Sequence, residues 1–240
     1  NENLDKLIQR NIISEADAGA YNGVYKLAMI LTLFVTAYRM GVEPFFFKVS
    51  EKADSRKTYA DVLLYFSIVC NVVIIGVVAN LDWIKLILIR NPSYWIAMDI
   101  VPIILIANLF YGLYFNLSTW YKVTDKTYVG TIISLIGCGI TVIMNFTLLR
   151  KYGFMVSAWA TLLAYGSMML ISYFWGQKEY KIPYKTKKIV FYTTSAIIIT
   201  CVTYYLLDNN FFIGNSLLIM YIAMTYFIEK RSLKLENKIR

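Results

Sequence analysis

The sequence predicts an all-α protein, a polytopic bundle of about seven transmembrane helices. Hydrophobic residues make up 58% of the 240 residues and charged residues only 16%. In a typical soluble domain, about 45–50% of the residues are apolar and roughly 25% are charged. The apolar residues also gather in runs of about 20, the length that crosses the hydrocarbon core of a bilayer. These observations exclude a solvated globular enzyme, a disordered chain and a coiled coil.

Seven runs in the sequence are long and apolar enough to cross a membrane. Charged segments follow the first, third, fourth, fifth and seventh of them, where the chain leaves the apolar region. In order along the chain, the predicted spans are Tyr25–Phe47, Val62–Asn80, Ile96–Leu117, Tyr128–Leu149, Phe154–Trp175, Ile189–Leu207 and Phe211–Ile228.

The segment LDWIKLILIRNPSYW between the second and third spans is apolar but too short to cross a bilayer. It contains Lys85 and Arg90, and its aromatic residues are Trp83, Tyr94 and Trp95. Because Trp and Tyr are enriched at headgroup depth, we interpret the segment as interfacial.

The distribution of Lys and Arg predicts the orientation. Sixteen of them follow spans one, three, five and seven, and six lie on the opposite side. Lys and Arg accumulate on the cytoplasmic side of membrane proteins, so we expect the C-terminus inside and the N-terminal polar stretch outside. The net charge of +9 is then mainly a topology signal, and no nucleic-acid partner is expected.

Several kinds of chemistry are excluded or disfavoured. The chain has no histidine, so it has neither a Ser-His-Asp or Cys-His site nor a histidine-bound metal. Cys70, Cys138 and Cys201 lie far apart in apolar runs, as small buried residues do. No nucleotide-binding motif is present, and no cofactor is expected.

Ionisable residues inside a membrane span are costly and often functional. Arg39 and Glu43 lie four residues apart on one face of the first span, followed by Pro44. They form either a cationic site for an anionic substrate or a structural ion pair near the interface. Lys26, at the outer end of the same span, is expected to extend its amine toward the headgroups.

Polar residues in and near the third span have two interpretations. Asp99 is either a helix N-terminal carboxylate, which we prefer, or a proton or cation site. Asn108, Tyr111, Tyr114 and Asn116 could share a face that lines a watery path. For the asparagines of the spans, including Asn71 and Asn145, the default expectation is hydrogen bonding between helices.

From span three onward, short motifs occur in an order that resembles a known family. They are Val101-Pro102-Ile103, Gly112 to Asn116, Trp120-Tyr121-Lys122, Thr124-Asp125-Lys126-Thr127, Asn145, Lys151-Tyr152-Gly153, Ala158-Trp159-Ala160-Thr161 and Gly176-Gln177-Lys178. Upstream, GAYNGVYKLAMILTLFVTAYRMGVEPFFF extends the pattern. Roughly Gly19 to Tyr184 resembles the C-terminal half of polysaccharide-export (O-antigen) flippases of the multidrug/oligosaccharidyl-lipid/polysaccharide exporter superfamily.

The resemblance implies one lobe of a two-lobed transporter in the bacterial cytoplasmic membrane. Residues 1–22 would be an extracytoplasmic polar segment, residues 23–184 spans one to five of the C-terminal lobe, and residues 185–240 the last two spans and basic tail. The start at Asn1, without a signal peptide, adds the expectation that the chain is a fragment that lacks an N-terminal lobe.

The implied activity is translocation of a lipid-diphosphate-linked oligosaccharide by alternating access, for polysaccharide or lipopolysaccharide biosynthesis. Arg39 would help to neutralise the diphosphate, Glu43 would hold Arg39 in place or exchange partners with it, and Lys26 is a second candidate for contact with the substrate. Asn108, Tyr111, Tyr114 and Asn116 would contact sugar hydroxyls or water, and Asp99 or Glu43 would couple an ion. The alternatives are a multidrug or cation antiporter of the same superfamily, which would need an acidic cavity, and a membrane glycosyltransferase or polymerase, for which the outer loops are short.

Overall fold

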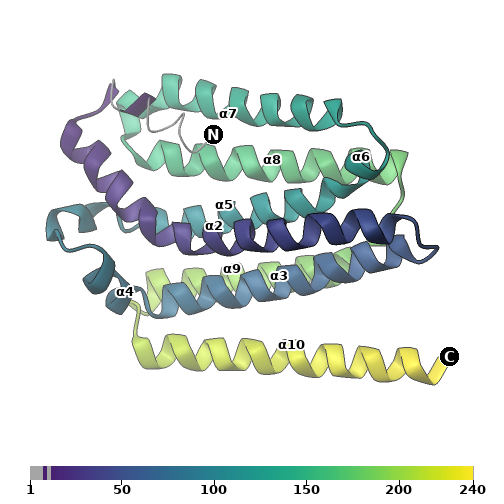
Figure 1. Cartoon of the computed structure of the whole chain (residues 1–240). Helices are drawn as coiled ribbons and strands as arrows, with labels where there is room; N and C mark the ends of the chain where they lie inside the picture. Colours follow the sequence, from purple (N-terminus) through teal and green to yellow (C-terminus); the bar gives the residue numbers. More distant parts are fainter. Residues whose placement is uncertain (1–7, 10–11, 240) are drawn as a thin grey trace.

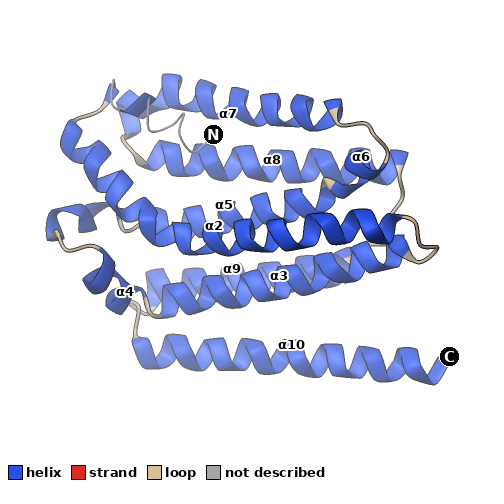
Figure 2. Ribbon diagram, viewed as in Figure 1, coloured by secondary structure: helices blue, strands red, loops and turns tan. Residues whose placement is uncertain are grey.

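The computed structural model describes residues 8–9 and 12–239, and for residues 233–239 it describes the backbone only. Lys6, Arg10 and Arg240, three of the counted basic residues, lie outside the described residues, as does much of the 1–22 segment. Over the described part of the chain the fold is helical and contains no strand (Figure 2). Seven of its helical segments are long and apolar enough to span a membrane, which confirms the predicted fold class.

The spans are formed by α2 (Glu15–Ser50), α3 (Ser55–Ala79), α5 (Ile100–Leu117) with α6 (Thr119–Val123), α7 (Tyr128–Tyr152), α8 (Met155–Glu179), α9 (Thr186–Cys201) with the π-helical turn η2 (Val202–Leu206), and α10 (Phe211–Ile239). Each contains most of one predicted apolar run. The prediction of seven spans in this order is therefore confirmed.

Helix α2 begins ten residues before the predicted start of the first span, at Glu15. The Ser14 hydroxyl accepts a hydrogen bond from the backbone N–H of Asp17 at 3.1 Å, which is a standard N-cap. Small residues of this first part bring it close to the chain before α5, because a Cβ on Gly23 would lie 2.6 Å from Tyr94 Cδ2. The helix continues through Pro44 to Ser50.

The interfacial segment folds into two short helices, α4 (Leu81–Leu88) and the 3₁₀ turn η1 (Pro92–Ala97). Lys85 pairs with Asp82 at 2.5 Å, and Trp83 is exposed. Tyr94 instead packs against α2. Both elements lie at the left end of the bundle in Figure 1.

Helix α5 forms the centre of the bundle. In the most apolar stretch of this span 89% of the residues are buried, because α2, α3 and α8 pack around it. Helix α7 packs mainly on α8, and α10 packs mainly on α3, so these two lie at opposite edges of the bundle (Figure 1). In the apolar stretch of α10 only 17% of the residues are buried, as expected where lipid replaces protein neighbours.

The last two helices share the bundle with the first five. Helix α9 packs along α3, and α10 contacts both α3 and α9. The basic stretch Lys178–Lys188 therefore joins α8, which packs on α5, to α9, which packs on α3.

Candidate functional site

Three charged side chains from α2 and α6 meet near one end of the bundle. Lys122 Nζ lies 2.8 Å from Glu43 Oε1, and Arg39 Nε lies 3.8 Å from Glu43 Oε2. The predicted pairing of Arg39 with Glu43 is present, but Lys122 makes the shorter contact. Two cations share one carboxylate, so the cluster carries a net positive charge.

The ring of Phe115 lies beneath both cations of this cluster. Arg39 Cζ is 4.9 Å and Lys122 Nζ 4.1 Å from the ring centroid. A cation over an aromatic face is attracted by the ring quadrupole. Phe115 is itself buried, so it gives the two flexible cationic side chains a fixed support.

The cluster is partly exposed and closely packed. The side chains of Arg39, Glu43 and Lys122 are 48%, 34% and 21% exposed. A cavity beside Glu43, Phe115 and Lys122 holds about 10 Å³, which is close to the smallest space that accommodates a single water molecule. In this conformation an anion can approach Arg39 from the surface, and the cavity beside Glu43 has room for about one water molecule.

The predicted polar residues of α5 face two directions. On the α2 side, Tyr38 Oη donates to Asn116 Oδ1 at 2.5 Å, and Asn108 Nδ2 donates to the Ala28 carbonyl at 3.2 Å. The other direction is taken by the two tyrosines. The ring centroids of Tyr111 and of Tyr165 in α8 are 4.9 Å apart, and the hydroxyl oxygens of Tyr114 and of Tyr121 in α6 are 3.0 Å apart.

These contacts confirm the default expectation for Asn108 and Asn116, which link α5 to α2. The expectation is not confirmed for Asn71, whose buried side-chain amide makes no hydrogen bond within the described part of the chain. Asn145 accepts a hydrogen bond from Ser157 at 2.6 Å and so links α7 to α8. Asn108, Tyr114 and Asn116 are buried between helices. Contact of these three side chains with sugar or water would need a conformation in which the helices separate, and it stays a prediction.

The remaining predicted residues lie away from the charged cluster. Lys26 is exposed, and it precedes Arg39 by thirteen helical residues, or about 20 Å along α2. Asp99 occupies the N-cap position of α5 without making a side-chain cap bond, and it accepts a hydrogen bond from Tyr204 at 2.7 Å. Asp99 therefore joins α5 to the π-helical turn η2.

A comparison of this chain with models of protein families, with curated proteins and with solved structures found no match.

Two contacts were missed by sequence reasoning. The contact of Lys122 with Glu43 joins positions 79 residues apart. Glu229 lies one residue beyond the predicted end of the last span, yet it is buried with Lys188 Nζ at 2.9 Å and Tyr192 Oη at 2.6 Å. Only the second contact has a sign in the sequence, because Lys188 and Glu229 lie at the same end of two consecutive spans.

Among the described residues, no group of three or more Asp, Glu or Cys side chains is placed to hold a metal ion.

Proposed function

We propose that this chain is the C-terminal lobe of a membrane flippase that moves a lipid-diphosphate-linked oligosaccharide by alternating access. It would work in the bacterial cytoplasmic membrane, for polysaccharide or lipopolysaccharide biosynthesis, with an N-terminal lobe as its partner. The observation that carries the proposal is the net positive cluster of Arg39, Glu43 and Lys122 on α2 and α6.

The cluster suits a diphosphate for electrostatic reasons. Hydrogen bonds between guanidinium or ammonium groups and phosphate oxygens are short and strong, and Arg can offer two parallel N–H donors. Glu43 holds both cations when no anion is bound. An arriving diphosphate would take over Arg39 and Lys122, and Glu43 would recover them when the anion leaves.

The position of the cluster also suits a lipid-linked substrate. It lies at the end of the bundle where the basic connectors gather, which positive-inside reasoning assigns to the cytoplasmic leaflet. The phosphates of a membrane-anchored substrate lie at headgroup depth. A partly exposed cationic site at that depth can bind the phosphates while the lipid tail stays in the bilayer.

A drug or cation antiporter is disfavoured by the same cluster, since a cationic substrate would meet two positive side chains and one carboxylate. For a polymerase or glycosyltransferase, the short connections at the opposite end offer no room for a catalytic domain.

The test uses the full-length protein in cells that depend on it for polysaccharide export. Arg39→Ala and Lys122→Ala should each lower export at least about tenfold, because a hydrogen bond to a charged group contributes about 1.5–3 kcal/mol. Arg150→Ala removes an exposed arginine from the last turn of α7 and should leave export unchanged. Normal export by Arg39→Ala at normal expression would refute the role of this residue.

A further inference from the structure

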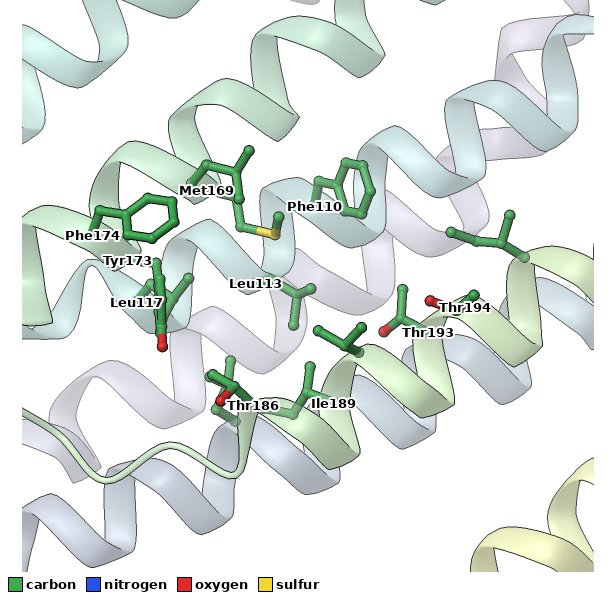
Figure 3. A pocket seen from close by; sticks show the side chains of 14 residues that line it. Phe110, Leu113, Leu117, Met169, Tyr173, Phe174, Thr186, Ile189, Thr193 and Thr194 are labelled. Atoms are coloured by element: carbon green, nitrogen blue, oxygen red, sulfur yellow. The ribbon is translucent and has the colours of Figure 1, made fainter.

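A second feature of the molecule, which shares no lining residue with the cavity at the charged cluster, is an apolar groove of about 430 Å³. It lies between α8 and α9, and α5 forms its floor (Figure 3). Met169 and Phe174 line one wall, Ile189 and Val190 the other, and Leu113 the floor. The volume falls within the roughly 300–1,000 Å³ range of small-molecule pockets. Such apolar walls favour the binding of a hydrocarbon chain.

One hydroxyl in this groove lacks a hydrogen-bond partner. Thr193 lines the α9 wall and is only 8% exposed, and its Oγ1 makes no hydrogen bond within the described structure. A buried hydroxyl without a partner is costly. The oxygen is covered in this conformation, so rotation about χ1 is needed before it can donate to an acceptor on a bound molecule, such as an ester carbonyl.

At one end the groove reaches the N-terminus of α9, where Thr186 lines it. No side chain caps this helix and its first turn contains no acidic residue. The free N–H groups and the positive end of the helix dipole therefore favour an anion, and phosphate is a frequent ligand of such termini.

Two lysines flank this end of the groove. Lys178 follows Phe174 by one turn on α8, beside a second hollow that it lines with Trp175, and Lys187 precedes Val190 by three residues on α9. Neither lines the groove, so each would reach its end from the rim. Both are exposed, and neither takes part in an ion pair among the described residues. By contrast, Lys185 pairs with Asp61 and Lys188 with Glu229.

We propose that the groove between α8 and α9 binds one anionic glycerophospholipid, with an acyl chain against Leu113 and Phe174 and the phosphate at Lys178, Lys187 and the N-terminus of α9. Thr193 would donate to an ester carbonyl of the lipid. Such a lipid would fill the space between two helices that the protein leaves apart. This assignment does not depend on the transported substrate.

Native mass spectrometry of the purified chain tests the proposal. The protein in detergent is mixed with equal amounts of phosphatidylglycerol and phosphatidylcholine that carry identical acyl chains. We expect one phosphatidylglycerol to be retained in about tenfold preference, the ratio that one charge-assisted contact provides. Equal retention of the two lipids would overturn the proposal.

The double variant Lys178→Gln/Lys187→Gln should lose this preference. Lys52→Gln/Lys57→Gln is the matched control, since it removes two exposed charges from the same end of the bundle, one in the turn after α2 and one in the first turn of α3. The control should keep the preference. If both variants lose it equally, the preference reflects the overall charge of that surface, and the assigned headgroup site is wrong.

The groove itself is tested by Val190→Trp, which places a large ring in the α9 wall. Ile198→Trp is its control, because Val190 and Ile198 are 62% and 57% exposed on the same helix, and only Val190 lines the groove. We expect Val190→Trp to lower phosphatidylglycerol retention about tenfold and Ile198→Trp to leave it unchanged. Leu170→Trp, on the opposite wall, replaces Val190→Trp if that variant fails to fold.

Unchanged retention in a folded groove variant would contradict the assignment of the acyl chain. Displacement of phosphatidylglycerol by an equal concentration of a long-chain isoprenoid phosphate would overturn the choice of occupant.

Discussion

Glu229 is the single charged residue, among those whose side chains the structure describes, that is buried in the protein. Lys188 Nζ contacts both of its carboxylate oxygens, at 2.9 and 3.1 Å, and the Tyr192 hydroxyl donates to one of them at 2.6 Å. The contact connects the start of α9 to α10, which has few other neighbours. A buried carboxylate is tolerable when it is paired, and removing its partner leaves a charge without compensation.

We predict that Lys188→Met lowers the free energy of unfolding by about 3 kcal/mol, the lower end of the range for breaking a buried ion pair. The double variant Lys188→Met/Glu229→Leu removes both charges and should recover most of the loss. Unfolding of the detergent-solubilised protein, followed by intrinsic fluorescence, measures the difference. Equal stability of Lys188→Met and the original protein would show that Glu229 does not need its partner.

The contacts of individual side chains differ in how far the sequence predicts them. Arg39 and Glu43 could be paired in advance because helical spacing puts residues i and i+4 on the same face. Lys122 could not, because its approach to Glu43 depends on how α6 turns after α5. For the same reason, the two faces of the α5 polar residues could not be assigned before their neighbours α2 and α8 were in place.

At the scale of helices, one of the closest approaches in the bundle occurs at Gly176 of α8. A Cβ at this position would lie 2.6 Å from Trp120 Cδ1, and Trp120 is only 1% exposed. The indole is held by Tyr121 and Trp175, whose ring centroids lie 5.5 and 6.4 Å away. It cannot move aside without disturbing the junction of α6 with α8.

Gly176→Ala should therefore destabilise the protein by about 1–3 kcal/mol, the cost of overpacking a filled interior. Gly139→Ala is the control, since no atom lies within 4 Å of the added carbon. That change should be neutral or stabilise by up to about 1 kcal/mol through helix propensity. Thermal unfolding of the two variants in detergent gives the comparison, and an equal effect at both glycines would contradict the packing argument.

The helices themselves were largely predictable, because the length of an apolar run is a local property of the sequence. The start of α2 was not, since its first ten residues include the polar Glu15, Asp17 and Asn22. They are helical because Ser14 caps them and because Gly23 allows Tyr94 to pack closely. The Ser14 cap is local, but the contact of Gly23 with Tyr94 joins segments about 70 residues apart, and hydropathy contains no information about it.

At the scale of the whole molecule, the helices alternate in direction and so place the basic connectors together. The turns after α2, after α6 and after α8 lie at one end of the bundle, and the turn between α7 and α8 lies at the other (Figure 1). Arg56 and Lys126 are among the charges at the first end. The side chain of Arg56 lies 4.3 Å from the Tyr180 ring centroid, and Lys126 pairs with Glu179. The pairing with Glu179 raises the pKa of Lys126, so this positive charge persists at physiological pH.

This arrangement makes the orientation in the membrane testable with single cysteines. Cys70, Cys138 and Cys201 are first replaced by alanine, and then Lys52→Cys and Lys151→Cys are made separately, one at each end of the bundle. Lys and Arg are retained on the cytoplasmic side during insertion, and the end with Lys52 has many more of them. A membrane-impermeant maleimide should therefore label Lys151→Cys in intact cells and Lys52→Cys only after permeabilisation. The reverse pattern would place the Arg39 cluster at the outer leaflet, where it would meet a lipid-linked substrate after translocation rather than before it.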